Sequence, residues 1–353
     1  MQCTSDAGHK VEPLLPGSRR PPIESLTGLR FLAALYVVLY HTHARVAKAH
    51  RLLHVRGLLF LRHGYLAVTL FFILSGFVLT YNYADRWTQS SFPKFFRARL
   101  ARIYPVYVLA LLCQVHFYWK HATFLKTAAV LLMVQSWTVM PSDFPGAWNF
   151  PAWTLSIEIF FYLCFPFLLF TLRRIRRRTL ALWITCLVSV ALGGAQAALA
   201  GRVSWFTVHI PLPLLRLPEF YLGMLLVDYS PKKTPIGRWP MIATLVATFA
   251  LLALNTHRFV LLIIFPFGAL IWLLANRPSL LRRVLESKLF VLLGAASYAI
   301  YLLQDPVSRW LNLWNVSNPG VLAGSFLYIC VLTVVGIAVF FWFEQPMRWW
   351  IRR

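Results

Sequence analysis

Long apolar runs alternate with short basic stretches along almost the whole chain. Between Leu26 and Phe343 the apolar runs are roughly 16 to 25 residues long, the length that a helix needs to cross a hydrocarbon core about 30 Å thick. Helices also satisfy their own backbone hydrogen bonds in lipid. A membrane β-barrel would need segments of about ten residues with alternating polarity, which this sequence lacks. The pattern therefore predicts an all-α polytopic membrane protein.

About ten transmembrane helices are predicted, at residues 26–43, 64–81, 104–119, 153–172, 180–199, 206–228, 239–255, 258–276, 289–304 and 319–343. An eleventh apolar stretch, residues 124–139, decides the topology. The arginine-rich residues 173–178 belong in the cytoplasm by the positive-inside rule. If Lys10, Arg19 and Arg20 keep the N-terminus inside, this cluster is cytoplasmic only when 124–139 does not cross. We therefore predict a re-entrant or interfacial segment at 124–139 and two cytoplasmic termini.

The domain organisation predicted from this pattern is simple. Residues 1–25 are polar and rich in proline, and we expect a disordered basic cytoplasmic leader there. The apolar run that follows is too long for a signal peptide. Residues 26–353 then form one transmembrane domain, without an internal repeat or an appended soluble domain. One loop argues against the predicted orientation, because residues 44–63 would carry basic side chains outside: Arg45, Lys48, Arg51, Arg56 and Arg62.

Composition agrees with a membrane protein and argues against a nucleic-acid partner. The chain is 59% hydrophobic and 13% charged, whereas a soluble domain is about a quarter charged. Its net charge is +24, but the basic residues lie mainly between apolar runs, where positive-inside placement and anionic lipid headgroups explain them. No nucleic-acid-binding motif is visible. The five cysteines form no C-x-x-C pair and no spacing typical of zinc, so we expect no metal site.

Two ionisable residues in the first predicted helix are candidates for chemistry, because such groups are costly inside lipid. Arg30 and His41 are separated by eleven positions, which places them on nearly the same helix face, about 16 Å apart. This separation suits an extended acyl-CoA ester, with its phosphates at Arg30 and its thioester near His41. Alternatively, Arg30 anchors the helix end and His41 reaches the interface from an apolar helix.

Glu158 is one of few acidic residues inside an apolar run. It could hold a cationic His41 or orient a neutral one, as carboxylates do for catalytic imidazoles. The alternative is a structural pair with a neighbouring arginine.

Arg99 and Arg102 lie three positions apart and share a helix face. Guanidinium groups bind phosphates with forked geometry, so these two predict a CoA phosphate site, or else an ordinary positive-inside loop.

Two further features have mainly structural interpretations. Glu219 has a ready local partner in Arg216, one helical turn earlier. Ser75 and Gly76 lie inside an apolar helix, where small residues usually permit close helix packing. A nucleophilic serine at this position is the alternative, but no partner base is visible beside it.

Together, these segments resemble the bacterial membrane-bound acyltransferase-3 family, which includes acetyltransferases of O-antigen, exopolysaccharide and some macrolides. The resemblance covers nearly the whole chain, in the family's order. The matching residues are Arg30 and His41; Phe71, Phe72, Ser75 and Gly76; Arg99, Arg102, Ile103, Tyr104 and Pro105; Trp153, Leu155, Ser156, Glu158, Phe161 and Tyr162; Ser297, Tyr298, Tyr301, Leu302 and Leu303; Glu344 and Pro346. The chain departs from the family pattern at Thr69, Ile159, Gln304 and Asp305.

The resemblance implies ten core helices and a membrane O-acyltransferase. We expect an enzyme of the bacterial cytoplasmic (inner) membrane that transfers an acyl group, in the first instance acetyl, from acyl-CoA. The expected acceptor is a hydroxyl of a cell-envelope or exported polysaccharide, met as a glycan or lipid-linked sugar. In this hypothesis His41 is the general base, Glu158 supports it, and Arg30, Arg99 and Arg102 bind the donor. The alternatives are acylation of a small secondary metabolite such as a macrolide sugar, a non-enzymatic transporter, or a structural subunit of a glycan-assembly complex.

Overall fold

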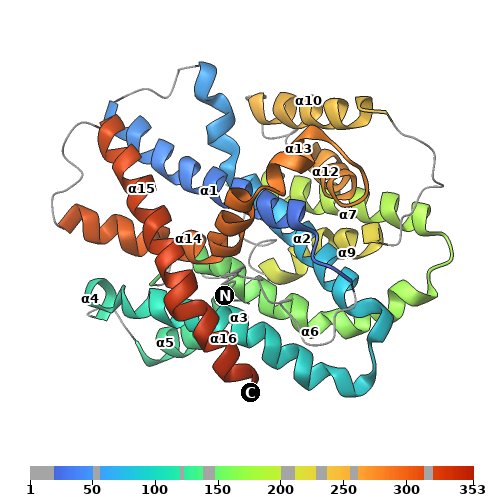
Figure 1. Cartoon of the computed structure of the whole chain (residues 1–353), viewed down its shortest axis with the longest axis horizontal. Coiled ribbons are helices and arrows are strands. Elements are labelled where there is room, and N and C mark those ends of the chain that lie inside the picture. Colours follow the sequence, from blue (N-terminus) through green and yellow to red (C-terminus); the bar gives the residue numbers. More distant parts are fainter. Residues whose placement is uncertain are drawn as a thin grey trace, which may run out of the picture.

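A computed structural model describes residues 20–50, 56–119, 123–137, 148–199, 211–227, 237–254, 261–313 and 321–353. Within these ranges all regular secondary structure is helical (Figure 1). The all-α prediction is therefore confirmed. Most of the predicted leader, residues 1–19, lies outside the described part of the chain.

The α-helices are α1 (Glu24–His50), α2 (Ala67–Tyr83), α3 (Phe92–Leu112), α4 (Val115–Tyr118), α5 (Phe124–Leu131), α6 (Trp153–Arg174), α7 (Arg178–Leu199), α9 (Leu212–Val227), α10 (Trp239–Ala253), α12 (Ile264–Asn276), α13 (Leu280–Leu285), α14 (Lys288–Leu313), α15 (Val321–Val339) and α16 (Gln345–Arg352). A long 3-10 segment precedes α2 (Arg56–Leu66), and a π-helical turn joins α15 to α16 (Phe340–Glu344). Short 3-10 turns occupy Ala84–Arg86, Gln89–Ser91, Gln135–Trp137, Phe150–Ala152 and Leu261–Ile263.

By length and composition, the described residues contain five helical stretches suited to crossing a membrane: Phe60–Arg86, Phe150–Arg174, Arg178–Gln196, Lys288–Asn312 and Ala323–Arg352. Helices α10 and α12 are apolar but shorter. These features identify a membrane protein, while the count of ten spans and the cytoplasmic termini stay predictions.

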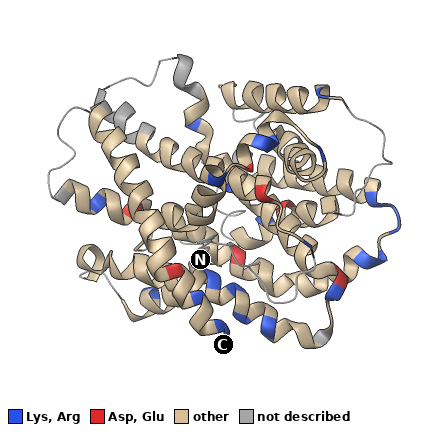
Figure 2. Cartoon of the chain, in the orientation of Figure 1, with Lys and Arg blue, Asp and Glu red and all other residues tan. Residues whose placement is uncertain are grey.

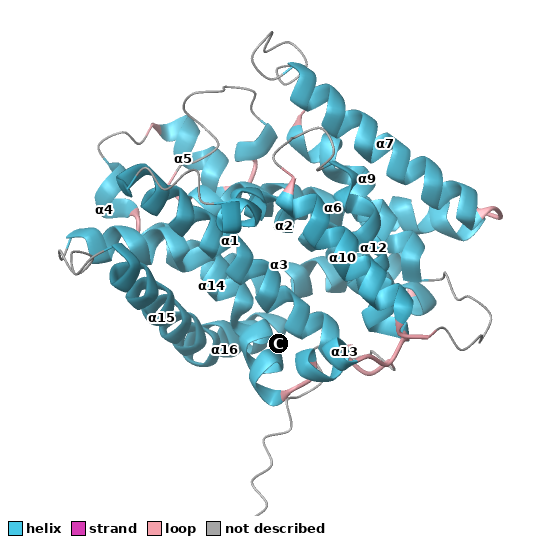
Figure 3. Cartoon of the chain, turned by 90° about the horizontal axis from the view of Figure 1, so that it is seen from above, coloured by secondary structure: helices cyan, strands magenta, loops and turns pink. Residues whose placement is uncertain are grey.

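Burial separates central helices from peripheral ones. The apolar window of Phe60–Arg86 is 72% buried, against 11% for Arg178–Gln196. Accordingly, α2 lies inside the bundle and α7 lies along its edge (Figure 3). Because apolar side chains on the edge face outward, lipid rather than water suits that surface.

The described part of the predicted re-entrant or interfacial segment, residues 124–137, does not form one continuous helix. Helix α5 has eight residues, about 12 Å at 1.5 Å per residue, which is well short of a hydrocarbon core. Thr123 caps its start by accepting a hydrogen bond from the Lys126 backbone amide at 3.4 Å. The chain then turns at Met133, whose φ is 55°. This geometry agrees with an interfacial or re-entrant segment and gives no single-helix crossing.

Helix α3 begins well before the predicted span at 104–119. A proline in its first turn, Pro93, suits a helix start, since its missing amide would be unpaired there anyway. The helix continues through Pro105 to Leu112. Arg99 and Arg102 therefore lie within this helix rather than in a preceding surface loop. The helix extends beyond the predicted span because the arginines interrupt the apolar run without interrupting the helix, and the bounds of the span itself stay a prediction.

Helices α2 and α9 pack closely at a pair of glycines. A Cβ on Gly76 would lie 1.9 Å from the Phe220 carbonyl oxygen, and one on Gly223 would lie 1.9 Å from that of Ile73. Each glycine thus lets the backbone of the other helix approach. The predicted packing role of Gly76 is confirmed, and the contact fixes the position of α2 beside the central cavity.

Candidate active site

A cavity of about 840 Å³ lies where α1, α2, α3, α6 and α14 meet. Each helix contributes one face at helical spacing, because positions three or four apart lie on the same side. Most of the lining is apolar. Its charged residues are Arg30, Arg99, Arg102 and Glu158, and its hydroxyl-bearing residues are Ser75, Thr154, Tyr162, Ser297, Tyr298 and Tyr301.

The cavity therefore brings four of the five predicted site residues together. Arg30 comes from α1, Arg99 and Arg102 from α3, and Glu158 from α6. With three guanidinium groups and one carboxylate, the charged part of the lining carries a formal excess of two positive charges. Such an excess in a partly closed space favours an anionic ligand, because the low-dielectric walls strengthen the attraction.

Glu158 is held by a tyrosine on its own helix. The Tyr162 hydroxyl, one turn further along α6, donates a hydrogen bond to Glu158 Oε1. Tyr162 is 2% exposed, so this bond is shielded from solvent. A buried donor to a carboxylate is a strong, charge-assisted bond. It fixes the direction in which Glu158 enters the cavity.

Two tyrosines of α14 complete this wall. The Tyr298 hydroxyl donates to the Ile103 carbonyl oxygen at 2.6 Å and so ties α14 to α3. The Tyr301 hydroxyl lies 3.3 Å from Thr154 Oγ1 and 3.4 Å from the Pro151 carbonyl oxygen. Both residues belong to one of the motifs that carry the family resemblance, and no role is predicted for that motif from the sequence.

The arginines differ in how they are held. Arg99 is 4% exposed, donates to the Tyr83 hydroxyl at 3.1 Å, and lies over the Tyr83 and Phe95 rings. Its Nε is buried without a hydrogen-bond partner among the described residues. Arg30 and Arg102 are partly buried. Because such donors are costly to leave unpaired, Arg99 Nε is a natural contact for an anion.

A second cavity, of about 750 Å³, adjoins the first. The two share Arg30, Val78, Arg99 and Arg102 in their linings. The second is also lined by Arg20, Arg348 and Arg352, together with Pro22, Ile23, Leu26, Thr27, Tyr81 and Asn82. Basic positions on α3 and at the C-terminal end of α16 accordingly lie near one another (Figure 2). From the sequence, only a cytoplasmic location is predicted for this end of the chain.

His41 lies elsewhere on α1. It is not among the described residues that line either cavity. Its ring packs edge-on against Tyr40, at 5.0 Å between centroids, and against Phe150, at 5.4 Å. Phe150 belongs to the turn that leads directly into α6. His41 is therefore close to the start of the helix that carries Glu158, while support of His41 by Glu158 stays a prediction.

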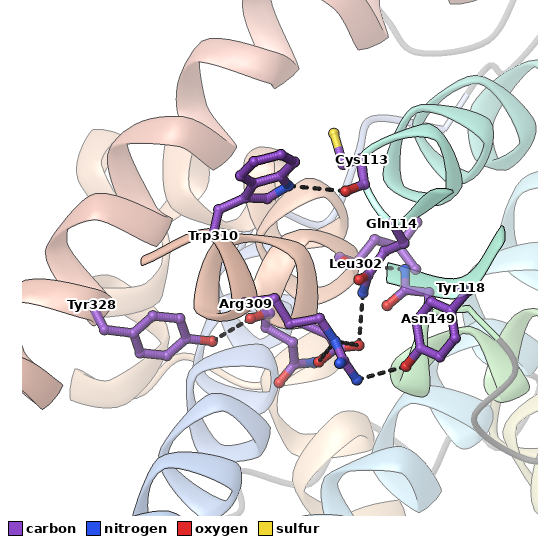
Figure 4. A network of polar contacts seen from close by, with 10 residues as sticks. Cys113, Gln114, Tyr118, Asn149, Leu302, Arg309, Trp310 and Tyr328 are labelled. Atoms are coloured by element: carbon purple, nitrogen blue, oxygen red, sulfur yellow. Dashed lines mark hydrogen bonds and ion pairs between the residues drawn. The ribbon is translucent and has the colours of Figure 1, made fainter. Parts of the chain in front are cut away.

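A separate polar network joins α14 to the end of α3 and to α4 (Figure 4). Gln114 Nε2 donates to Asp305 Oδ2 at 2.7 Å, and Arg309 Nε lies 3.2 Å from Asp305 Oδ1. Arg309 also donates to the Tyr118 hydroxyl at 2.6 Å. Asp305, a departure from the family pattern, therefore has a structural role in linking these helices.

The interpretation of Glu219 as a structural residue is confirmed. Arg216 Nη1 lies 2.7 Å from Glu219 Oε1 on α9, and the Thr69 hydroxyl also donates to that oxygen at 3.4 Å. Ser75 lines the first cavity, whereas its neighbour Gly76 faces α9. Ser75 thus belongs to the cavity lining, and Gly76 allows the close packing of α2 on α9.

The fold and its cavities define a class: an all-helical membrane protein with a basic internal site. A family model for an acyltransferase domain matches residues 23–345. The chain therefore belongs to the acyltransferase-3 family and is an enzyme that transfers acyl groups. The first matched motif, at Arg30, lies inside this region, and the last, formed by Glu344 and Pro346, straddles its C-terminal boundary.

Individual relatives agree with this membership. The chain is 30% identical over 354 residues to acyltransferase MdmB of Streptomyces mycarofaciens, covering 88% of each protein. It is 23% identical over 360 residues to O-acetyltransferase OatA of Staphylococcus aureus, covering 92% of this chain and 57% of the relative. No solved structure matches the chain.

Proposed function

We propose that this acyltransferase moves an acyl group, acetyl in the first instance, from acyl-CoA onto a hydroxyl of a cell-envelope or exported polysaccharide. The observation that carries the proposal is the pair of adjoining cavities that meet at Arg30, Arg99 and Arg102. Six arginines and no carboxylate are among the described residues that line the second cavity, whereas three arginines, Glu158 and a larger set of apolar side chains line the first. A CoA thioester has the same division, with phosphates at one end and an uncharged pantetheine arm at the other.

The residues present fit such a donor. Forked guanidinium groups bind phosphate oxygens by paired hydrogen bonds, and Arg99 has a buried Nε free of any described hydrogen-bond partner. The apolar walls of the first cavity, including Phe71, Phe72 and Leu155, suit the methylene groups of the arm. The arm would then pass Glu158 and Tyr301 on its way toward the part of α1 that carries His41.

The transfer requires one proton to leave the acceptor. In the proposed mechanism His41 takes the proton of the acceptor hydroxyl, and the oxygen attacks the thioester carbonyl carbon. A carbon–oxygen bond forms, the carbon–sulfur bond breaks, and the CoA thiolate leaves and is protonated. General-base catalysis of this kind contributes about 10² to 10⁴, and positioning of the two reactants supplies more. Glu158 supports the site electrostatically.

Membrane orientation follows from the same proposal. The donor is made in the cytoplasm, so the basic cavity would open there, with both chain termini on that side of a bacterial inner membrane. A glycan or lipid-linked sugar would meet His41 at the other end of α1. The positive-inside pattern supports this orientation, because Arg348 and Arg352 belong to a basic chain end.

The experiment is acetyl transfer from labelled acetyl-CoA by purified protein, with a crude envelope-glycan extract as acceptor. Wild-type protein should label the glycan, and His41→Ala should lose at least about 100-fold in rate. His116→Ala is the matched control, since His116 is exposed on α4 and lines neither cavity. Full activity in folded His41→Ala would refute the assignment of the base. No transfer by folded wild-type protein would refute the proposed combination of acetyl-CoA as donor and an envelope polysaccharide as acceptor.

A further inference from the structure

The final transmembrane stretch changes its helical phase just before its basic end. Helix α15 runs to Val339, a π-helical turn follows at Phe340–Glu344, and α16 continues to Arg352. A π-turn holds an extra residue, and such turns are frequent at functional sites. From the last residue of the turn onward, Glu344, Arg348 and Arg352 recur every four residues and so share a helix face.

This face is packed inward against α3. Helices α16 and α3 are in contact, and Arg97 of α3 donates to the Arg352 carbonyl oxygen at 3.0 Å. The two helices also lie side by side in Figure 1. The end of the chain is therefore built into the wall of the basic cavity rather than left free at the surface.

A buried ion pair sets the position of Arg348. Glu344 is 0% exposed and Arg348 is 8% exposed, and Arg348 Nη2 donates to Glu344 Oε1. Burying two charges carries a desolvation penalty that further contacts must offset. Arg348 Nε, however, is buried with no hydrogen-bond partner among the described residues. The ion pair therefore fixes the direction of the Arg348 side chain, and the Arg348 Nε–H group stays available to donate a hydrogen bond to a ligand.

The charge of this cavity favours a ligand with several negative charges. Six arginines line it: Arg20, Arg30, Arg99, Arg102, Arg348 and Arg352. The described structure gives a carboxylate partner to two of these, Asp85 for Arg20 and Glu344 for Arg348. The described residues that line the cavity include no carboxylate, since neither Asp85 nor Glu344 is part of the lining. A CoA moiety carries about four negative charges, two on its diphosphate and nearly two on its 3′-phosphate monoester.

We infer that Arg348, with Arg352 beside it, binds the 3′-phosphate of the donor's adenosine end. This inference rests on the proposed function, in which the donor is an acyl-CoA. Arg30, Arg99 and Arg102 line both cavities and would hold the diphosphate, which joins the arm to the nucleotide. Arg348 and Arg352 line only the second cavity, where the nucleotide end lies. Glu344 is a positioning residue that aims Arg348.

The enzyme should consequently distinguish acetyl-CoA from acetyl-dephospho-CoA, which differs only in lacking the 3′-phosphate. Loss of one charge-assisted, partly buried contact pair corresponds to about 10- to 100-fold in apparent affinity. The difference should appear in KM, since the nucleotide end is remote from the reacting carbon.

The test measures kcat and KM for both thioesters with the full chain in detergent. Wild-type protein should show a KM for acetyl-CoA about 10- to 100-fold lower than for acetyl-dephospho-CoA. Arg348→Gln should bring the two KM values together, and Arg348→Lys should keep part of the difference. Glu344→Gln should reduce the ratio without abolishing turnover. Arg283→Gln is the control, since Arg283 is an exposed residue of α13 outside both cavities.

A second measurement uses wild-type protein alone and so does not depend on variant folding. Adenosine 3′,5′-bisphosphate should compete with acetyl-CoA at least about tenfold better than adenosine 5′-monophosphate does. Equal competition, or an unchanged KM ratio in folded Arg348→Gln, would overturn the inference while leaving the proposed function intact. If anionic phospholipid rather than nucleotide fills the cavity, neither nucleotide will compete. Turnover of neither thioester by folded wild-type protein would overturn the proposed function and this inference with it.

Discussion

Replacing Gly76 with alanine tests whether the α2–α9 contact shapes the cavity. The added Cβ would lie 1.9 Å from the Phe220 carbonyl oxygen, whereas ordinary contacts begin at 3.4 Å. The opposing atom is backbone, so it cannot move by a side-chain rotation. The two helices must therefore separate by about 1.5 Å locally, because neither backbone can yield in a close-packed interior.

Two effects of opposite sign set the magnitude. Overpacking a close contact costs about 1–3 kcal/mol, while alanine is about 1 kcal/mol better than glycine inside a helix. Because the opposing atom is backbone, we expect the overpacking cost to lie toward the upper end of its range, which leaves a net destabilisation of up to about 2 kcal/mol and a fall of a few degrees in Tm. Helix α2 also lines the cavity through Phe71, Ser75 and Val78. A displacement near 1 Å at a reacting site can cost about 100-fold in rate.

The assay compares apparent Tm and acetyl transfer for wild-type protein and Gly76→Ala in the same detergent. Gly237→Ala is the matched control, because an added Cβ there meets nothing within 4 Å. Gly76→Ala should be less stable than this control and at least about tenfold slower. If Gly76→Ala is as stable and as active as Gly237→Ala, the close contact does not shape the site and the reasoning is refuted.

Three further substitutions probe the cavity and the network beside it. Tyr162→Phe removes the hydroxyl that donates a hydrogen bond to Glu158 and should lower the rate constant of single-turnover acetyl transfer about tenfold. An unchanged rate constant would show that the orientation of Glu158 by Tyr162 does not contribute to catalysis. Arg102→Gln should raise the KM for acetyl-CoA about 10- to 100-fold with little change in kcat, and equal KM values would exclude Arg102 from the donor site. Asp305→Asn weakens the bonds with Gln114 and Arg309 and should destabilise the protein by about 1–3 kcal/mol with the donor KM unchanged. An unaltered Tm would contradict the structural role of Asp305.

Much of the site could be predicted because it follows local rules. Arg99 and Arg102 had to share a face at a spacing of three, and an arginine or glutamate inside an apolar run needs a polar environment. These rules, with the family resemblance, led to the four charged residues that line the first cavity. The all-helical fold followed equally directly from the length of the apolar runs.

The missed residues depend on features that periodicity does not report. Only a cytoplasmic location is predicted from the sequence for the chain end that carries Arg348. The π-turn that directs Arg348 inward leaves no clear mark in the apolar pattern of residues 319–343. A usable signal was present in Glu344, an acid four residues before Arg348 at the end of an apolar run. Such a pair indicates a buried contact rather than a free basic end.

The position of His41 shows a different limit. Its angular position relative to Arg30 followed from helix geometry, but what surrounds it depends on distant parts of the chain. Phe150, which packs on the His41 ring, comes from the turn before α6 and has no local relation to α1. Packing between segments so far apart in sequence cannot be read from either segment alone.

The central claim is that Arg30 and its neighbours bind an acyl-CoA whose acyl group is transferred to a hydroxyl. The most direct test follows labelled acetyl from acetyl-CoA into an alkali-labile ester, using wild-type protein, Arg30→Gln and the exposed control Arg283→Gln at limiting donor. The account predicts ester formation by wild-type protein and by the control, and a rate at least about tenfold lower for folded Arg30→Gln. Equal rates in all three proteins, or no ester from folded wild-type protein, would contradict it.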